Sequence, residues 1–230
     1  MKWLIVTGDD FGISRGVNRG IVEAHLGGIV TSTSLMVDRP ACEEAVALAR
    51  EHSTLSVGLH LELDAVDPED LPGEIERQHT RFADLVGSAP THVDTHHDVH
   101  RDPRILSHLL PWGRRVGVPV RGHSGVRHFS KFYGQWGGET HLEQIGVAGL
   151  LRLLDTEVGE GMTELNCHPG YVEPSFPSSY AAEREVELQT LCDPGLRRAI
   201  EERGIRLIGF RDLPALAAPG STAPVPGDAA

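Results

Sequence analysis

Segments with strand character and segments with helix character alternate along the whole of this chain. Strands are predicted at 3–6, 29–37 and 55–63, within 90–100, and at 118–122, 162–171 and 205–210. Helices are predicted between them, at 14–25, 41–50, 74–86, 105–116, 142–158, 183–191 and 195–203. Repeated strand–helix–strand units use right-handed crossovers and build a parallel sheet. About seven such units favour an α/β fold closed into a barrel, with an open doubly wound sheet as the alternative.

The pattern also indicates a single domain. No linker rich in glycine, serine and proline divides residues 1–213, and a chain of 230 residues can bury a full hydrophobic core. Residues 123–138 are irregular, with several glycines and aromatic side chains, and we interpret them as an active-site loop. Residues 214–230 are mostly alanine, proline and glycine, which predicts a disordered tail.

Charge and cysteine content restrict the partners of the protein. A net charge of -12 argues against a nucleic-acid backbone or an anionic membrane surface as the main partner. No apolar stretch approaches membrane-spanning length, and the first apolar run is too short for a signal peptide. Cys42, Cys167 and Cys192 have no paired spacing, which fits a reducing compartment. We therefore expect a cytoplasmic protein without a transmembrane segment or a nucleic-acid partner.

Two adjacent carboxylates, Asp9 and Asp10, follow the first apolar strand. A single aspartate there commonly begins a turn or a helix. Two buried carboxylates need compensation, which a metal ion can supply. Adjacent residues of a strand point to opposite faces, so the two side chains are expected to have different roles unless a turn at Gly8 or Asp10 relaxes this constraint.

Further polar residues come at or near the ends of later strands. We expect Asp10, His60 and His96 to meet at one rim of the sheet and to form a carboxylate and two-imidazole site for a divalent cation. His60 alone could equally be a buried structural histidine. The same rim also collects residues that we expect to contact the substrate or the metal ligands: Asp94, His97 and Arg121.

A hydrolytic mechanism is compatible with this set. A bound cation polarises an acyl oxygen and lowers the pKa of a water molecule. Asp9 could then accept the proton of that water, and His168, fixed by the following Pro169 and Gly170, could protonate a leaving amine. No serine or cysteine nucleophile motif and no nucleotide-binding loop competes with this interpretation.

At these residues the chain resembles the YdjC/ChbG/HpnK family of carbohydrate deacetylases, over nearly all of its length up to about residue 212. The stretches that carry the resemblance are 9–18 (DDFGISRGVN), 28–33 (GIVTST), 58–60 (GLH), 90–97 (PTHVDTHH), 99–100 (VH) and 167–170 (CHPG). Each stretch is short, but their combination in this order is highly specific.

The resemblance implies a distorted TIM-like (β/α) barrel, a divalent metal given as Mg²⁺ with Zn²⁺ or Mn²⁺ as alternatives, and often a homodimer. It implies that Asp10, His60 and His96 are the metal ligands, Asp9 the base and His168 the acid. The implied reaction is hydrolysis of an N-acetyl group from an amino sugar, carried by an N-acetylglucosamine-containing oligosaccharide or a glycolipid. Two alternatives stay open: another metal-dependent hydrolase or sugar isomerase on the same barrel, and a non-catalytic sugar-binding protein.

Overall fold

The computed structural model describes residues 1–174, 176 and 178–217. Strands and helices alternate through most of this part of the chain, as the sequence predicts. The strands are β1 (Lys2–Phe11), β2 (Ser32–Leu35), β3 (Ser56–Leu61), β4 (Val93–Thr95), β5 (Arg127–Phe129), β6 (Gln135–Trp136), β7 (Glu139–Thr140), β8 (Gly161–Cys167) and β9 (Ile205–Leu207). The helices are α1 (Arg15–Leu26), α2 (Cys42–Glu51), α3 (Leu71–Val86), η1 (His96–Arg101), α4 (Pro103–Val116), α5 (Leu142–Ile145), α6 (Val147–Glu157), α7 (Ala181–Leu191), α8 (Leu196–Glu202), η2 (Phe210–Asp212) and α9 (Leu213–Ala217).

Seven of the strands form one parallel sheet, in the order β4-β3-β2-β1-β8-β5, with β9 beside β1. β8 follows one edge of β1 over its length. The other edge is divided: β9 pairs with its beginning and β2 with its later part. The sheet is curled into a distorted, incompletely closed barrel, so the expected α/β architecture is confirmed.

The gap between the two edges of the barrel is bridged by a segment that the sequence analysis predicted to be a strand. Val120 makes only an isolated parallel bridge to Val93 at the β4 edge, so the strand predicted at 118–122 is reduced to one position. Seven residues later, β5 pairs with β8 at the opposite edge of the sheet. The chain from Val120 to β5 therefore spans the two edges, and Arg121 lies inside the barrel at this point, with only 1% of its surface exposed.

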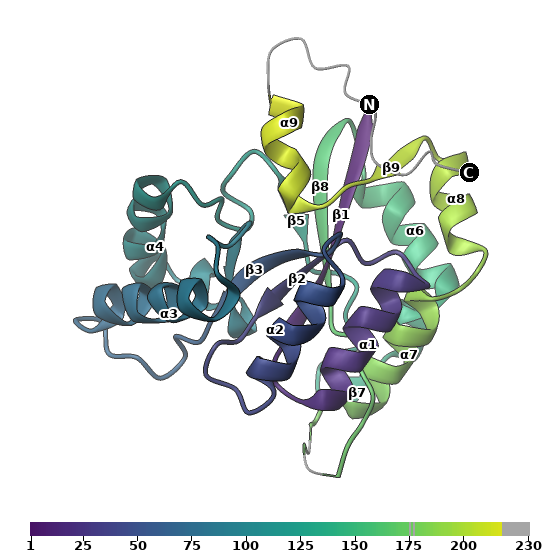
Figure 1. Cartoon of the computed structure of the whole chain (residues 1–230). Helices are drawn as coiled ribbons and strands as arrows, with labels where there is room; N and C mark the ends of the chain where they lie inside the picture. The colour runs from purple at the N-terminus through teal and green to yellow at the C-terminus, as the bar shows by residue number, and fades with distance from the viewer. Residues whose placement is uncertain (175, 177, 218–230) are drawn as a thin grey trace.

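The helices surround the sheet in an order that follows the strands. α4 contacts α3, α3 contacts α2, α2 contacts α1, and α1 contacts α7 (Figure 1). α5 contacts both α7 and α6. The N-terminus of α1 is capped by a side chain: the Ser14 hydroxyl accepts a hydrogen bond from the Val17 amide at 3.2 Å, and Gly27 ends the helix. This cap fixes the turn that follows Asp9 and Asp10.

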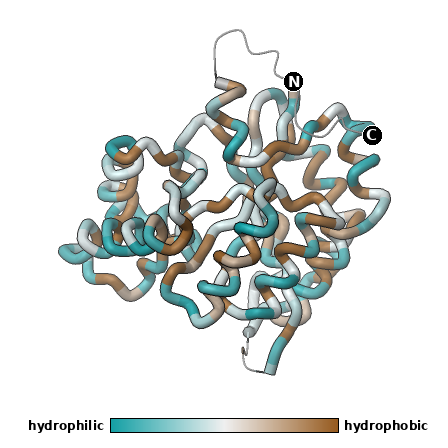
Figure 2. The backbone as a smooth tube through the Cα atoms, in the orientation of Figure 1, coloured by the Kyte–Doolittle hydropathy of each residue, from teal (hydrophilic) through white to brown (hydrophobic). Residues whose placement is uncertain are grey.

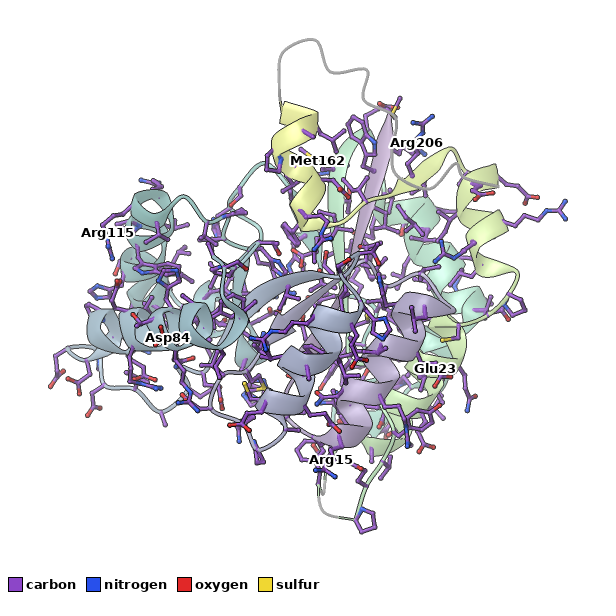
Figure 3. All side chains as sticks on the ribbon, in the orientation of Figure 1. Arg15, Glu23, Asp84, Arg115, Met162 and Arg206 are labelled. Carbon is purple, nitrogen blue, oxygen red and sulfur yellow. The ribbon has the colours of Figure 1, made fainter. Side chains whose placement is uncertain are left out.

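Hydrophobic side chains fill the space between the sheet and the helices. The main core cluster includes Leu4, Val6, Ile21, Leu59 and Leu165, all fully buried. Figure 2 shows hydrophobic and hydrophilic residues alternating along the outer helices. Charged side chains labelled in Figure 3, among them Arg15, Glu23, Asp84 and Arg115, lie on exposed surfaces of these helices.

The barrel interior is polar, unlike this core. Thr7, Asp94 and Glu164 are fully buried there, and Thr7 donates a hydrogen bond to Glu164 at 2.9 Å. Buried charges of this kind are costly unless they are paired. Arg121 supplies most of the positive charge that pairs with these buried carboxylates.

Two further elements differ from the sequence-based expectations. The helix predicted at 142–158 is broken at Gly146, whose extended backbone (ψ 168°) separates α5 from α6. Residues 213–217 form α9, so helix continues past the expected domain boundary at 213, and the rest of the expected tail, 218–230, lies outside the described residues. No helix of the described part is long and apolar enough to cross a membrane.

Candidate active site

Asp9 and Asp10 both face one cavity, although neighbouring residues of a regular strand point to opposite faces. A register shift between Gly8 and Phe11 interrupts the pairing of β1 with β2, and Asp10 has a φ of 69°. Such an irregularity turns one side chain relative to its neighbour. The turn at Asp10 therefore relaxes the expected opposition and presents both carboxylates to the same space.

Asp10, His60 and His96 converge at the floor of this cavity. Asp10 Oδ1 lies 3.3 Å from His60 Nε2 and 3.2 Å from His96 Nδ1. The three atoms lie within 4.8 Å of one another, and buried Asp10 Oδ1 has no hydrogen-bond partner among the described residues. One carboxylate oxygen and two imidazole nitrogens that share a small space are a donor set for a divalent cation. The residues present therefore fit such a cation.

Asp94 orients the ring of His60. His60 Nδ1 donates a hydrogen bond to Asp94 Oδ1 at 2.6 Å, which leaves Nε2 directed toward Asp10. Carboxylates commonly fix metal-binding histidines in this way. Burial alone would lower the pKa of His60, but the carboxylates of Asp94 and Asp10 outweigh it and hold that pKa well above its usual value.

Arg184 of α7 occupies the other oxygen of Asp10. Its Nη2 donates to Asp10 Oδ2 at 2.5 Å, and its Nη1 donates to the carbonyl of His168 at 3.3 Å. Burial raises the pKa of Asp10, but the Arg184 guanidinium reverses this and holds the pKa well below its usual value. Asp10 is therefore ionised, with one oxygen paired and one directed at the two histidines.

Asp9 is held by four hydrogen bonds. Arg121 donates Nη2 to Oδ1 at 2.7 Å and Nη1 to Oδ2 at 2.9 Å. Ser34 donates to Oδ1 at 3.2 Å and Asn166 to Oδ2 at 3.1 Å. Burial raises the pKa of Asp9, but the charge of Arg121 outweighs that effect and lowers it. Asp9 is therefore a fixed and ionised carboxylate beside the metal-ligand candidates.

His168 lies next to Asp9, with Nε2 3.9 Å from Asp9 Oδ2. Its backbone amide donates to Glu187 Oε2 at 2.5 Å, and its Nδ1 is 4.0 Å from Glu187 Oε1. Burial lowers the pKa of His168, against the opposing charges of Asp10 and Asp9, and burial raises the pKa of Glu187 to about 8. These contacts hold the imidazole at the side of the cavity.

The other residues singled out from the sequence take two kinds of position. Asp94 and Arg121 lie beneath the cavity, where Arg121 Nη2 is 2.6 Å from Asp94 Oδ2 and Nε donates to Glu164 at 3.0 Å. They contact the residues that face the cavity and do not line it themselves. His97 lies at the rim, 68% exposed, and pairs with Asp64 at 2.7 Å.

Sequence reasoning missed several residues of the site. Glu164 and Asn166 lie on one face of β8, four and two positions before His168, so the period-two pattern of that strand could have found them. Ser34 belongs to a run of polar residues in a buried strand, which is a similar signal. Arg184 lies in a helix with charged residues at 183–185 and 187, a pattern that resembles a solvated surface, so nothing local indicated its role.

The cavity above these residues has a volume of about 600 Å³, within the usual range for small-molecule sites. The lining includes the charged side chains of Arg39 and Asp98 and the imidazoles of His96 and His97. Four aromatic side chains also line the cavity, and we call them the aromatic wall: Phe132, Tyr133, Phe176 and Tyr180. The lining therefore offers a ligand both polar partners and an apolar surface.

Comparison of the chain with known proteins shows which family it belongs to. The model of the YdjC-like protein family matches residues 3–73 and 64–202, which together include every residue of the site described above. The chain belongs to the YdjC family. A carbohydrate deacetylase of Geobacillus stearothermophilus is 34% identical over 250 residues, covering 92% of this chain and 98% of the relative. A chitooligosaccharide deacetylase of Enterobacter sp. (strain 638) is 36% identical over 256 residues, covering 92% and 99%.

Solved structures give the same fold. A crystal structure from Enterococcus faecalis V583 has a TM-score of 0.81 and 28% identity, covering 92% of this YdjC-family chain and 98% of its own. A family 4 acetyl xylan esterase from Clostridium thermocellum, solved with a cobalt ion, has a TM-score of 0.56 and 13% identity, covering 94% and 91%. The second likeness concerns the fold alone.

Proposed function

We propose that this protein hydrolyses the N-acetyl group of an amino sugar in an N-acetylglucosamine-containing oligosaccharide or glycolipid. The observation that carries the proposal is the convergence of Asp10 Oδ1, His60 Nε2 and His96 Nδ1 at the floor of a cavity flanked by Asp9 and His168. Two relatives named as deacetylases, each more than 30% identical over nearly the whole chain, support the reaction class.

Asp10, His60 and His96 would hold a divalent cation. When bound, such a cation polarises an acyl oxygen and lowers the pKa of a water molecule. The family resemblance favours Mg²⁺, while two imidazole ligands suit Zn²⁺ or Mn²⁺ equally well. Arg184 keeps the charge of Asp10 in place, and Asp94 keeps the Nε2 atom of His60 directed toward the shared space.

The two residues at the sides of the cavity have opposite tasks. Asp9, kept ionised by Arg121, accepts the proton of the attacking water. His168 delivers a proton to the nitrogen of the amino sugar as the bond to the acetyl carbon breaks. A lowered pKa makes protonated His168 a stronger proton donor. Acetate and the free amine are the products.

The test is acetate release from di-N-acetylchitobiose and longer chitooligosaccharides with Mg²⁺, Zn²⁺ or Mn²⁺. We expect turnover that stops on addition of a chelator and falls at least about 100-fold in Asp9→Asn, since a general base is commonly worth that much or more. Mass analysis of the product separates the alternatives: a sugar isomerase leaves the mass of the substrate unchanged. Absence of acetate with every metal and substrate would contradict the proposed reaction.

Two further expectations complete the proposal. All three cysteines lie in the described residues and none is paired, which supports a reducing cytoplasm as the location. The homodimer implied by the resemblance stays a prediction, and light scattering of the purified protein tests it.

A further inference from the structure

Tyr133, in the aromatic wall of the cavity, is unusually exposed for an aromatic side chain. Tyr133 lines the cavity, yet 38% of its surface is exposed. It lies between β5 and the β6–β7 hairpin. An exposed aromatic ring at the mouth of a polar cavity is a common ligand-binding feature.

The ring of Tyr133 packs against the ring of Tyr180. It stacks on Tyr180, with ring centroids 4.5 Å apart and an angle of 9° between the planes. Tyr180 is itself fixed, because its hydroxyl donates to Glu187 Oε1 at 2.5 Å and accepts from the Gly134 amide at 2.7 Å. Gly134 directly follows Tyr133. The hydrogen bond between the Gly134 amide and the Tyr180 hydroxyl therefore fixes both the ring of Tyr180 and the backbone next to Tyr133.

The position of the ring relates it to the reacting groups. The centroid of Tyr133 lies 5.9 Å from that of His168, at an angle of 73°. Asp10, His60 and His96 line the same cavity as Tyr133 and His168. A flat ligand placed against Tyr133 would therefore share this cavity with the candidate metal ligands and with His168.

A pyranose ring has the surface that this position needs. One face of the sugar presents carbon-bound hydrogens that pack on an aromatic ring, while the hydroxyl groups project sideways toward water or polar partners. We propose that Tyr133 is the stacking surface for the pyranose ring whose acetamido group is hydrolysed, with Tyr180 as the residue that positions it. The inference rests on the proposed function, because it assigns the sugar of that reaction to one wall of the cavity.

The test compares four proteins: wild type, Tyr133→Ala, Tyr133→Phe and Trp136→Ala. Trp136 is a matched control from the neighbouring hairpin, since it is 49% exposed, stacks on His141 at 3.7 Å, and does not line the cavity. Two measurements are made on each protein with di-N-acetylchitobiose: steady-state kinetics of acetate release with metal, and the dissociation constant of the sugar by calorimetric titration.

Loss of the stacking surface should weaken binding of the sugar more than the chemical step. For Tyr133→Ala we expect KM and the sugar dissociation constant to rise about tenfold with kcat nearly unchanged, since tenfold corresponds to about 1.4 kcal/mol, within the range of an aromatic contact. Tyr133→Phe keeps the ring and should resemble wild type, as should Trp136→Ala. Tyr133→Leu replaces Tyr133→Ala if circular dichroism shows that the alanine variant does not fold.

The outcomes separate this inference from the proposed function. A tenfold loss of sugar binding in Tyr133→Ala supports the inference even if the wild type releases no acetate, a result that would overturn only the proposed reaction. Unchanged binding in Tyr133→Ala overturns the inference while deacetylation can stand. A fall in kcat with unchanged KM also overturns it, because Tyr133 would then act through His168. A wild type that neither binds nor turns over the sugar overturns both.

Discussion

Arg121 and Asp9 form a two-pronged ion pair inside the barrel, with N–O distances of 2.7 and 2.9 Å between the guanidinium and the carboxylate. The two residues are 112 positions apart in the sequence, and Arg121 comes from the segment that bridges the open edges of the sheet. Closure of the barrel and the orientation of Asp9 therefore depend on the same side chain.

The first prediction concerns the shape of this pair. Arg121→Lys keeps a positive charge but loses the planar fork, so Asp9 should shift within the cavity. We expect kcat/KM for acetate release to fall about 10–100-fold, because small misplacement of a base is costly. Arg115→Lys is the control, since Arg115 forms an exposed pair with Glu76 at 2.7 Å. Equal kcat/KM values in the two variants would show that the fork of Arg121 does not position Asp9.

The second prediction concerns the orientation of His60. Asp94→Asn removes the charge that holds His60 Nδ1, and we expect the dissociation constant of Mn²⁺ or Zn²⁺ to rise about 10–100-fold, as for other carboxylates behind a metal-bound histidine. Titration calorimetry measures the change. Asp64→Asn is the matched control, because Asp64 pairs with the exposed His97 outside the candidate ligand set. Metal affinity that is unaffected by Asp94→Asn would contradict the assigned role of Asp94.

The third prediction uses a buried histidine away from the cavity. Burial lowers the pKa of His92 from 6.5 to about 4, against the smaller opposing effect of Asp94. Between these values the unfolded chain binds a proton that the folded protein does not, so stability falls as the pH decreases from 6.5 toward 4. At about pH 5 the loss is about 2 kcal/mol relative to neutral pH, from 1.36 kcal/mol for each unit.

Urea unfolding at about pH 5 and about pH 8 measures this contribution. His92→Gln cannot titrate, so its loss of stability between the two conditions should be smaller than that of the wild type by about 2 kcal/mol. His123→Gln, at an exposed position, should retain the wild-type dependence. Equal pH dependence in the wild type and His92→Gln would mean that His92 is not held neutral by the fold.

Much of the site could be predicted from the sequence with one rule about parallel strands. Parallel strands have their carboxyl ends at one rim, and β1, β3 and β4 are near neighbours in the sheet. Polar residues at those ends therefore met, which brought Asp10, His60 and His96 together. The alternation of strands and helices was sufficient for this step, without knowledge of any side-chain conformation.

Other features depended on tertiary structure that no local pattern contained. Asp10 adopts a φ of 69°, which non-glycine residues rarely adopt, so a regular strand was the reasonable expectation. The bridge at Val120 and the three residues of β5 are too short to give a periodic signal. Arg184 approaches Asp10 from a position 174 residues away, in a helix that looks solvated in sequence.

Gly58 shows that a residue near a candidate metal ligand can be required for packing. A Cβ atom at Gly58 would lie 2.4 Å from the ring of His92, which in turn stacks on Phe210 at 3.9 Å. Gly58 precedes His60 by two residues on β3, so the close approach of His92 and the placement of His60 share one strand. A side chain at position 58 would have to displace the ring beneath the site.

The central claim is that a divalent cation binds between Asp10, His60 and His96. Anomalous diffraction from crystals soaked in Mn²⁺ tests it most directly, because the barrel holds two other clusters that could take a cation: Asp9 with His60 and Asp94, and His92 with Asp94 and Glu164. We predict a single strong peak bounded by Asp10 Oδ1, His60 Nε2 and His96 Nδ1. A peak at either of the other clusters alone, or no peak in a crystal with full Mn²⁺ access, would contradict the account.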